Sequence, residues 1–173
     1  AYNNHLLMKC YDLLVIKQYE PVIRILSFIL SEKAFKNRMD ERYELINVIN
    51  LAQAYKKIGD SKRCEELLKR YHWDTKNAKF QQAYYVLSDD FEKAAELMSA
   101  IEKSNDRLKM DDYKAWPLFD KFRLTDVFRE AYKSVFQQEY TEPLTVPEDF
   151  PRVSELLGKS NQKTLAKVFD EVK

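Results

Sequence analysis

The sequence contains few of the residues that form tight turns, with only 2 Gly and 5 Pro among 173 residues. A β-sheet protein of this size needs many such turns, so the scarcity argues against sheet architectures and predicts long helices joined by short loops. Cysteine is also rare. Cys10 and Cys64 lie far apart within apolar helical patterns, and we expect two buried free thiols rather than a disulfide framework.

An excess of charge of one sign is missing too, since 29 Lys and Arg face 28 Asp and Glu. A nucleic-acid-binding domain usually shows a clear basic excess. The most basic stretch, residues 56–70, also contains Glu65 and Glu66, and the spacing from Glu65 to Lys69 predicts an ion pair along one helix face. We therefore expect this stretch to be a solvated, self-paired face, and nucleic acid to be an unlikely partner.

Long apolar runs are absent, and no run approaches the ~18 residues of a membrane span. There is no signal peptide with a basic start and an apolar middle. These two features predict a cytoplasmic protein that does not contact a membrane. The sequence starts at Ala1 without an initiator Met, and we expect it to be a fragment of a longer protein.

Motifs for catalysis or metal binding are equally scarce. A phosphate-binding loop needs several glycines, but only Gly59 and Gly158 are present. His5 and His72 have no partner at ligand spacing, and neither cysteine has a neighbouring Cys or His. Acidic pairs are most simply helix caps and loop charges. The sequence predicts no enzyme activity, no metal and no cofactor.

Apolar residues at a helical period run through most of the chain. They predict helices over residues 4–17, 19–33, 41–58, 61–71, 77–87, 91–103, 116–123 and 126–139, with a weaker pattern over 107–113 and two short helices over 152–157 and 161–172. Asp40, Asp60 or Ser61, and Thr125 are the expected caps, and Gly59 the expected stop. No segment shows the alternation of a strand, so the fold class is all-α.

One predicted hairpin has the residue pattern of a known helical repeat. Residues 50–71 carry a leucine, small residues, aromatics and a turn glycine at the expected sites: Leu51, Ala52, Tyr55, Gly59, Cys64, Leu68 and Tyr71. This segment resembles a tetratricopeptide repeat. Because Ala52 and Cys64 are small, the two helices can approach closely, and we expect these two residues to touch.

Three looser repeats accompany this one. Val22, Cys64, Ala94 and Phe128 occupy equivalent sites at intervals of 42, 30 and 34 residues, against a period of about 34 in the family. The resemblance implies a domain of repeats over residues 1–140 (about 4–39, 40–75, 76–105 and 106–140), stacked as antiparallel helix hairpins in a right-handed α-solenoid. Residues 141–173 would form a proline-containing crossing segment and capping helices. In the last hairpin we expect one aromatic cluster of Trp116, Phe119, Phe122, Phe128, Tyr132 and Phe136.

The same resemblance implies a concave groove, lined by the first helix of each hairpin, that binds a protein or peptide. On the helix over 41–58 the row facing it is Ile46, Asn50, Gln53 and Lys57, which the sequence places off the core. Gln81 and Tyr85 are the candidates on the helix over 77–87. The family's carboxylate clamp is not reproduced, because Ile49 stands where a lysine is needed. Two alternatives stay open: a nucleic-acid-binding helical array, and a purely structural or regulatory module of a larger protein.

Overall fold

A computed structural model of the chain describes residues 2–31, 39–105 and 107–142. The chain divides into two units, residues 1–141 and residues 142–173. The second unit lies outside the described residues except for Glu142, and so do the crossing segment and capping helices predicted there.

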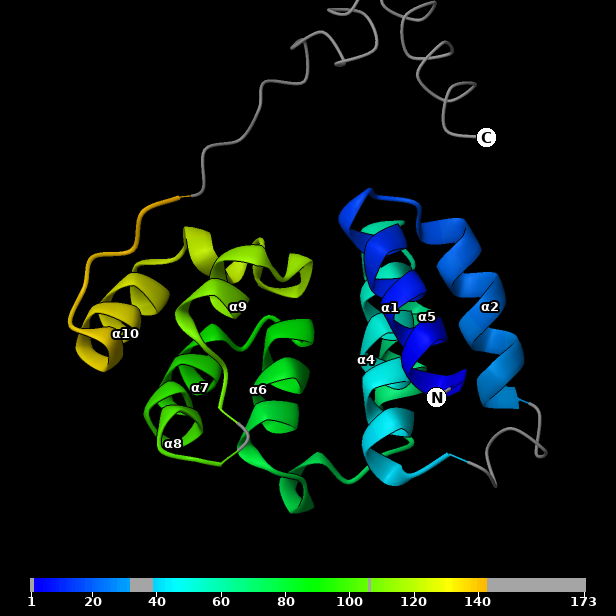
Figure 1. Ribbon diagram of the computed structural model, residues 1–173, viewed down its shortest axis with the longest axis horizontal. Helices are drawn as coiled ribbons and strands as arrows, with labels where there is room; N and C mark the ends of the chain where they lie inside the picture. The colour runs from blue at the N-terminus through cyan, green and yellow to red at the C-terminus, as the bar shows by residue number, and fades with distance from the viewer. Residues whose placement is uncertain (1, 32–38, 106, 143–173) are drawn as a thin grey trace, which may run out of the picture. The chain divides into compact units, whose positions relative to one another are not determined.

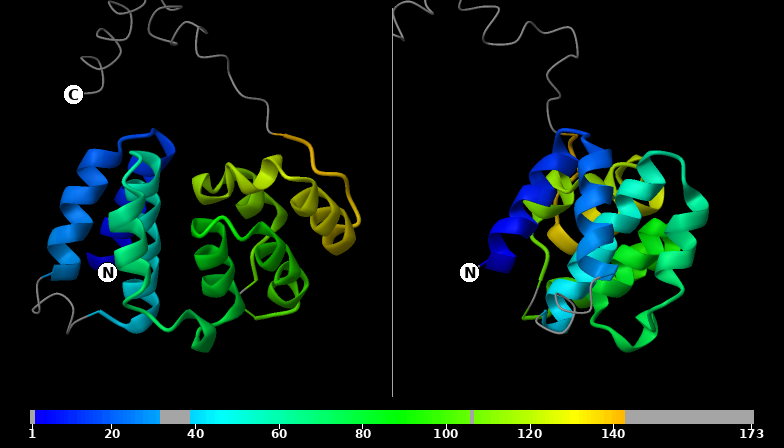
Figure 2. Two further views of the ribbon diagram at one scale, coloured as in Figure 1. Left: turned by 180° about the vertical axis from the view of Figure 1, so that it is seen from behind. Right: turned by 90° about the vertical axis from the view of Figure 1, so that its right-hand side faces the viewer.

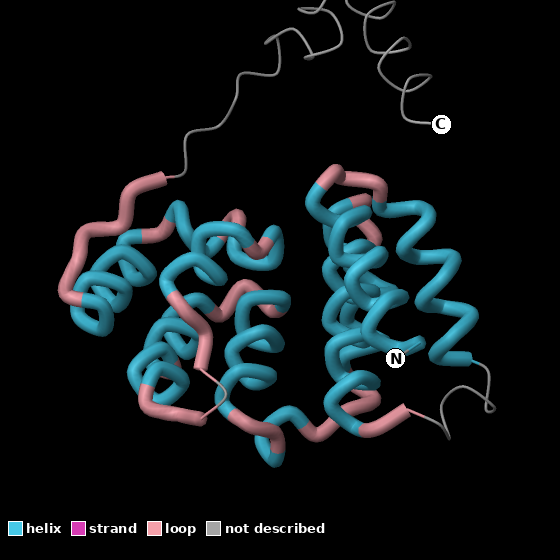
Figure 3. The backbone as a smooth tube through the Cα atoms, viewed as in Figure 1, coloured by secondary structure: helices cyan, strands magenta, loops and turns pink. Residues whose placement is uncertain are grey.

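The described part of the chain is all-helical, as the sequence predicts (Figures 1 and 3). Its elements are α1 (Tyr2–Val15), α2 (Tyr19–Ser31), α4 (Glu41–Lys57), α5 (Ser61–Leu68), α6 (Ala78–Leu87), α7 (Phe91–Glu96), α8 (Met98–Glu102), α9 (Met110–Ala115) and α10 (Asp126–Phe136), with short 3-10 turns η1 (Trp73–Thr75), η2 (Pro117–Phe119) and η3 (Phe122–Leu124). None of the described helices is both long enough and apolar enough to cross a bilayer.

Local capping determines where most helices begin. The side chains of Asp40, Asp60 and Thr125 accept hydrogen bonds from the backbone amides of Tyr43, Arg63 and Phe128, which confirms these predicted caps. Gly59 follows α4 with a φ of +83°, a conformation that glycine adopts without strain.

Neighbouring helices pack in pairs: α1 with α2, α4 with α5, and α6 with α7. In each pair the chain reverses at a short turn, so the two helices are antiparallel (Figures 1 and 2). Helix α4 also packs against α1, α2 and α6, and it is therefore the central helix of the first half of the unit. Ala52 and Cys64 are both buried where α4 meets α5; direct contact between them stays a prediction.

The structure corrects the predicted helices in two places. The helix predicted over residues 91–103 is interrupted at Leu97, between α7 and α8; nothing in the sequence marks this break. The helix predicted over residues 116–123 is replaced by the turns η2 and η3, while α9, just before them, overlaps the weaker pattern predicted over residues 107–113. Pro117 explains this order, because it disfavours a helical conformation at Trp116, which has a ψ of 119°.

The predicted aromatic cluster is present. Trp116, Phe119 and Phe122 form successive ring contacts with centroids 5.1 and 6.1 Å apart, and the chain of contacts continues from Phe122 to Phe128 at 4.9 Å. Tyr132 and Phe136 extend it at 5.6 and 4.8 Å. Tyr113, which the sequence did not single out, contacts three of these rings.

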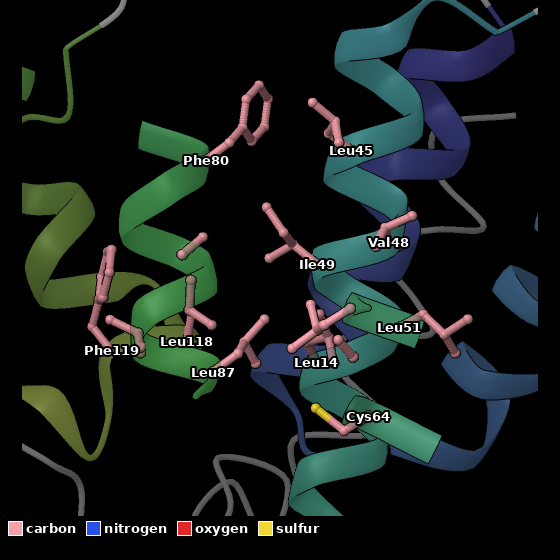
Figure 4. Close-up of a cluster of buried hydrophobic side chains, with 14 of the residues drawn as sticks. Leu14, Leu45, Val48, Ile49, Leu51, Cys64, Phe80, Leu87, Leu118 and Phe119 are labelled. Atoms are coloured by element: carbon pink, nitrogen blue, oxygen red, sulfur yellow. The ribbon is translucent and has the colours of Figure 1, made fainter. Parts of the chain in front are cut away.

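The core continues between α4 and α6. Figure 4 shows Ile49 pointing from α4 toward α6, with Phe80 and Leu45 facing each other near the start of the two helices. All three side chains are buried. This packing covers much of the α4 face that carries the predicted binding row, and it determines how that row meets solvent.

Candidate functional site

The row of four residues predicted on α4 lies against two hollows of the molecule. Ile46 and Asn50 line one of them, and Gln53 and Lys57 line the other. The row is not solvated as expected, however. Asn50 and Gln53 each expose only 2% of their surface, while Ile46 is partly buried and Lys57 is exposed. The prediction that the two amides lie off the core is wrong, because α1 and α6 pack against α4 on both sides of the row.

The hollow lined by Ile46 and Asn50, called the main groove below, has a volume of about 420 Å³. It lies between helices that each begin a hairpin or its equivalent: α1, α4, α6 and α9. Its lining consists of Leu7, Met8, Tyr11, Ile46, Asn50, Lys79, Arg107, Leu108, Asp112 and Trp116. A neighbouring hollow of about 550 Å³ shares Leu7, Met8 and Ile46 with it and adds Asp40, Arg42 and Tyr43.

The main groove combines an apolar surface with a few charges. Met8, one of the apolar side chains in its lining, is 56% exposed. Lys79 and Arg107 supply positive charge and Asp112 negative charge. Burial raises the pKa of the Tyr11 hydroxyl, and the nearby charge of Asp112 raises it further.

Asn50 is the polar group deepest in the main groove. Its side chain forms no hydrogen bond with any residue that the structure describes. Asn47, one turn earlier on the same helix and also buried, donates from Nδ2 to Met39 Sδ at 3.2 Å and lines neither hollow. A buried amide normally has hydrogen-bond partners. Asn50 therefore offers a donor and an acceptor to a group that enters the main groove.

The smaller hollow, called the end pocket, has a volume of about 50 Å³, roughly the space of one or two water molecules. It lies where α4 and α6 end, and it is lined by Gln53, Lys56, Lys57, Val86, Leu87, Asp89, Leu118 and Lys121. Two of its lysines already have partners. Lys56 Nζ donates to the carbonyl of Leu87 at 2.6 Å and pairs with Asp89 at 2.7 Å, and Lys57 pairs with Asp120 at 2.5 Å.

Gln53 differs sharply from the other buried glutamine. Both its Nε2 and its Oε1 are buried without a hydrogen-bond partner in the described structure. Gln82, on α6, is fully buried but satisfied: its Nε2 donates to the carbonyl of Ala94 at 2.8 Å and its Oε1 accepts from the Tyr113 hydroxyl at 3.0 Å. Gln82 is a structural residue, whereas the fold gives the amide of Gln53 no partner.

The two candidates on α6 lie elsewhere. The Nε2 of Gln81 donates to the backbone carbonyls of Lys76 at 2.7 Å and Asp74 at 3.3 Å, so this side chain holds the turn before α6. The ring of Tyr85 lies tilted against that of Tyr84, and the ammonium of Lys93 lies 5.3 Å from its centre. Neither residue lines the main groove or the end pocket. Lys79 is the α6 residue that lines the main groove. The apolar pattern of the sequence did not point to it, because its side chain is charged.

No known protein family, curated protein or solved structure matches the chain. The site must therefore be interpreted from its own chemistry.

The described side chains also bear on thiol and metal chemistry. Cys10 and Cys64 are free and buried, and burial raises the pKa of the Cys64 thiol to about 11, which keeps it protonated and unreactive. Across the described residues no group of three or more His, Cys, Asp or Glu is placed to hold a metal. In the basic stretch the expected pair of Glu65 and Lys69 is present at 3.7 Å.

Proposed function

We propose that this chain is a non-catalytic domain that binds an extended segment of a partner protein in the main groove. The pairs α1/α2, α4/α5 and α6/α7 would stack as a tetratricopeptide-like right-handed solenoid, with α9 and α10 as a fourth, irregular pair. The first helices of these pairs then line one surface, as they do in the resembled family. The two free cysteines suit a reducing compartment, and we propose the cytoplasm as its location.

One observation carries this proposal: the side chain of Asn50 lines the main groove and forms no hydrogen bond within the described residues. The backbone of an extended peptide has free amide and carbonyl groups at every residue. An asparagine can donate to one of these groups and accept from another, so its position suits recognition of a peptide regardless of sequence. Met8, Ile46 and Trp116 around it would accept apolar side chains of the peptide.

A peptide-display selection tests the proposal, because it requires no identified partner. Random peptides of about ten residues, which span roughly 30 Å when extended, are selected on the chain and the binders are measured by fluorescence polarisation. We expect Asn50→Leu to weaken the selected peptides by at least tenfold. Asn47→Leu is the matched control, since Asn47 lies outside both hollows, and it should leave affinity unchanged.

Two results would contradict the proposal. One is a selected set that binds Asn50→Leu as tightly as the unaltered chain. The other is binding that is lost equally in Asn50→Leu and Asn47→Leu although both variants retain the far-ultraviolet circular dichroism of the parent. Either result would place the binding surface away from the main groove.

A further inference from the structure

One part of the main groove carries three polar side chains that solvent can reach. Tyr11 of α1, Asp112 of α9 and Trp116 at the end of α9 line it, and we call these three residues the acidic end. Tyr11 and Trp116 are half-buried and Asp112 is exposed. Neither the Tyr11 hydroxyl nor the Trp116 indole N–H forms a hydrogen bond within the described residues. A group bound in the main groove therefore meets free hydrogen-bonding atoms here.

The carboxylate of Asp112 is only half used by the fold. Its Oδ2 accepts a hydrogen bond from the backbone amide of Lys109 at 2.7 Å, an arrangement that caps the start of α9. None of the described lysines and arginines forms an ion pair with it. Its Oδ1 thus remains available, and its negative charge is not neutralised by a neighbour.

The electrostatics at Tyr11 show the sign of the charge at the acidic end. Burial raises the pKa of the hydroxyl most, and the charges of Asp112 and Asp12 raise it further. Arg123 lowers it, more weakly than either carboxylate raises it. Asp12 has an exposed partner of its own, Lys9 at 4.0 Å, whereas Asp112 has none. Negative charge therefore outweighs positive charge at the hydroxyl.

Arg123 is not a partner for the acidic end, because the fold already uses its guanidinium. Its Nη1 donates to the carbonyls of Tyr113 and Trp116 at 3.1 and 3.0 Å. Its Nη2 pairs with Asp120 at 2.5 Å, and the other oxygen of Asp120 pairs with Lys57. Only 14% of the Arg123 side chain is exposed. It holds the turn that follows α9 and would lose these contacts if it moved into the groove.

The two cations in the groove lining act elsewhere. Arg107 precedes α9 and lies 3.7 Å from Glu102. Lys79 is the second residue of α6, and its Nζ lies 5.7 Å from the centre of the Phe80 ring. Neither cation affects the pKa of Tyr11. The positive charges of the main groove therefore do not cancel the charge of Asp112 at the acidic end.

A guanidinium group fits the acidic end better than other side-chain groups do. It is planar, carries five donors and stacks on aromatic rings. It can therefore donate to Asp112 on α9 and to the Tyr11 oxygen on α1 while it lies against the Trp116 ring. An ammonium is a compact and strongly hydrated charge that gains less from a ring. A carboxylate is repelled by Asp112.

The acidic end also lies beside the group that the proposed function assigns to the peptide backbone. Asn50 is 98% buried, lines the same groove and forms no side-chain hydrogen bond within the described residues. One hollow of about 420 Å³ thus contains a backbone contact and a negatively charged end. A peptide whose backbone meets Asn50 has a side chain within reach of the acidic end.

We infer that the acidic end of the main groove is a specificity subsite for an arginine side chain of the bound peptide. This inference rests on the proposed function for the identity of the ligand as a peptide. Asp112 supplies the charge, Tyr11 a second acceptor and Trp116 the flat surface. Asn50 recognises the backbone whatever the sequence, and the acidic end selects among sequences.

A direct test uses N-acetylarginine amide as the probe and the indole N–H resonances of ¹⁵N-labelled protein as the readout. The chain has 2 Trp, and the Trp116 resonance is assigned by its loss in Trp116→Phe. Trp73 is an internal control, because it is buried and its indole donates to the Leu68 carbonyl. We expect the probe to shift the Trp116 resonance alone. N-acetylcitrulline amide, which is similar in shape but uncharged, should leave it in place.

Two variants show whether the response comes from Asp112. Asp112→Asn keeps an acceptor for the Lys109 amide and removes the charge, so it should abolish the response. Asp111→Asn is the matched control, since Asp111 is also exposed in the first turn of α9 but does not line the groove. No shift at Trp116 up to the solubility limit of the probe would overturn the inference. An equal response to the citrulline probe, or a response that survives Asp112→Asn, would do the same.

Selected peptides provide the second test and separate the two proposals. Among peptides that depend on Asn50, we expect arginine to be enriched at one fixed position, and citrulline at that position to weaken binding about tenfold. Asp112→Asn should abolish this preference, and Asp111→Asn should retain it. Binders that depend on Asn50 but show no such position refute the subsite and leave the proposed function standing. If no Asn50-dependent binder is obtained, the proposed function fails, and the titration with N-acetylarginine amide still decides the chemistry of the acidic end.

Discussion

Replacing Gln53 by leucine should stabilise the chain, and the same change at Gln82 should destabilise it. The two glutamines are both at least 98% buried, yet only Gln82 has hydrogen-bond partners. Leucine at position 53 removes an amide that gains nothing from the fold. Leucine at position 82 removes two hydrogen bonds and leaves the Ala94 carbonyl and the Tyr113 hydroxyl buried without a partner.

The magnitudes follow from the cost of burying polar groups. An unsatisfied amide in a protein interior costs about 1–3 kcal/mol, so Gln53→Leu should raise the free energy of unfolding by up to that amount. Two lost neutral hydrogen bonds and two stranded groups should lower it by about 2–4 kcal/mol in Gln82→Leu. For a chain of this length, 1 kcal/mol corresponds to about 2–4 °C in Tm.

Urea unfolding followed by circular dichroism measures both changes against the unaltered chain. The free energy of unfolding should rise in Gln53→Leu and fall in Gln82→Leu, although the two substitutions are chemically identical. If Gln53→Leu lost as much stability as Gln82→Leu, the amide of Gln53 would have hydrogen-bond partners in the folded chain, contrary to the structure.

Three further predictions concern the packing and charge around α4. Ala52→Leu should overfill a fully buried site and lower the free energy of unfolding by about 1–3 kcal/mol, and an unchanged urea midpoint would contradict this packing. Burial raises the pKa of the Cys64 thiol from 9.0 to about 11, so the folded chain holds that proton more tightly than the unfolded chain. The stability contributed by the protonated thiol is intact below pH 9 and is lost between about pH 9 and pH 11. Cys64→Ala should therefore flatten the dependence of stability on pH in that range. Lys56→Met should cost about 1–3 kcal/mol, since Lys56 binds the Leu87 carbonyl as well as a carboxylate, whereas Lys57→Met removes only a surface ion pair worth about 0–1 kcal/mol; equal losses would contradict the tie from Lys56 to α6.

Much of the fold could be predicted from the sequence because its signals are local. A cap such as Asp40 or Thr125 bonds to an amide three residues away, so the cap and the helix start are visible in one short segment. The aromatic cluster was also predictable, because its members lie close together in sequence: Phe128, Tyr132 and Phe136 recur at the helical period of α10, and Trp116, Phe119 and Phe122 are spaced three residues apart through the turns η2 and η3. The weaker pattern over residues 107–113 indicated the helix that the structure shows as α9, whereas the helix predicted over residues 116–123 is absent.

The burial of the α4 row could not be predicted in the same way. Its residues were placed off the core from the periodicity of α4 alone, and that pattern contains no information about α1 and α6, which pack against α4. For the same reason the tie from Lys56 to the end of α6 has no signal in the sequence, since the two positions are 31 residues apart. Because α1 and α6 pack against α4, Asn50 and Gln53 are buried instead of facing an open groove.

Asn50 and Gln53 are the residues of α4 where function and stability can be told apart. Asn50 lines the main groove and forms no side-chain hydrogen bond within the described residues. The amide of Gln53 is buried without a partner, and so is Asn47 Oδ1, although Asn47 Nδ2 donates to Met39. Departures from good packing that gather at one surface are expected where function competes with stability. A variant with leucine at both positions separates the two demands: it should unfold at higher urea concentration than the unaltered chain and bind no selected peptide. A double variant that is less stable and still binds would show that the amides serve the fold.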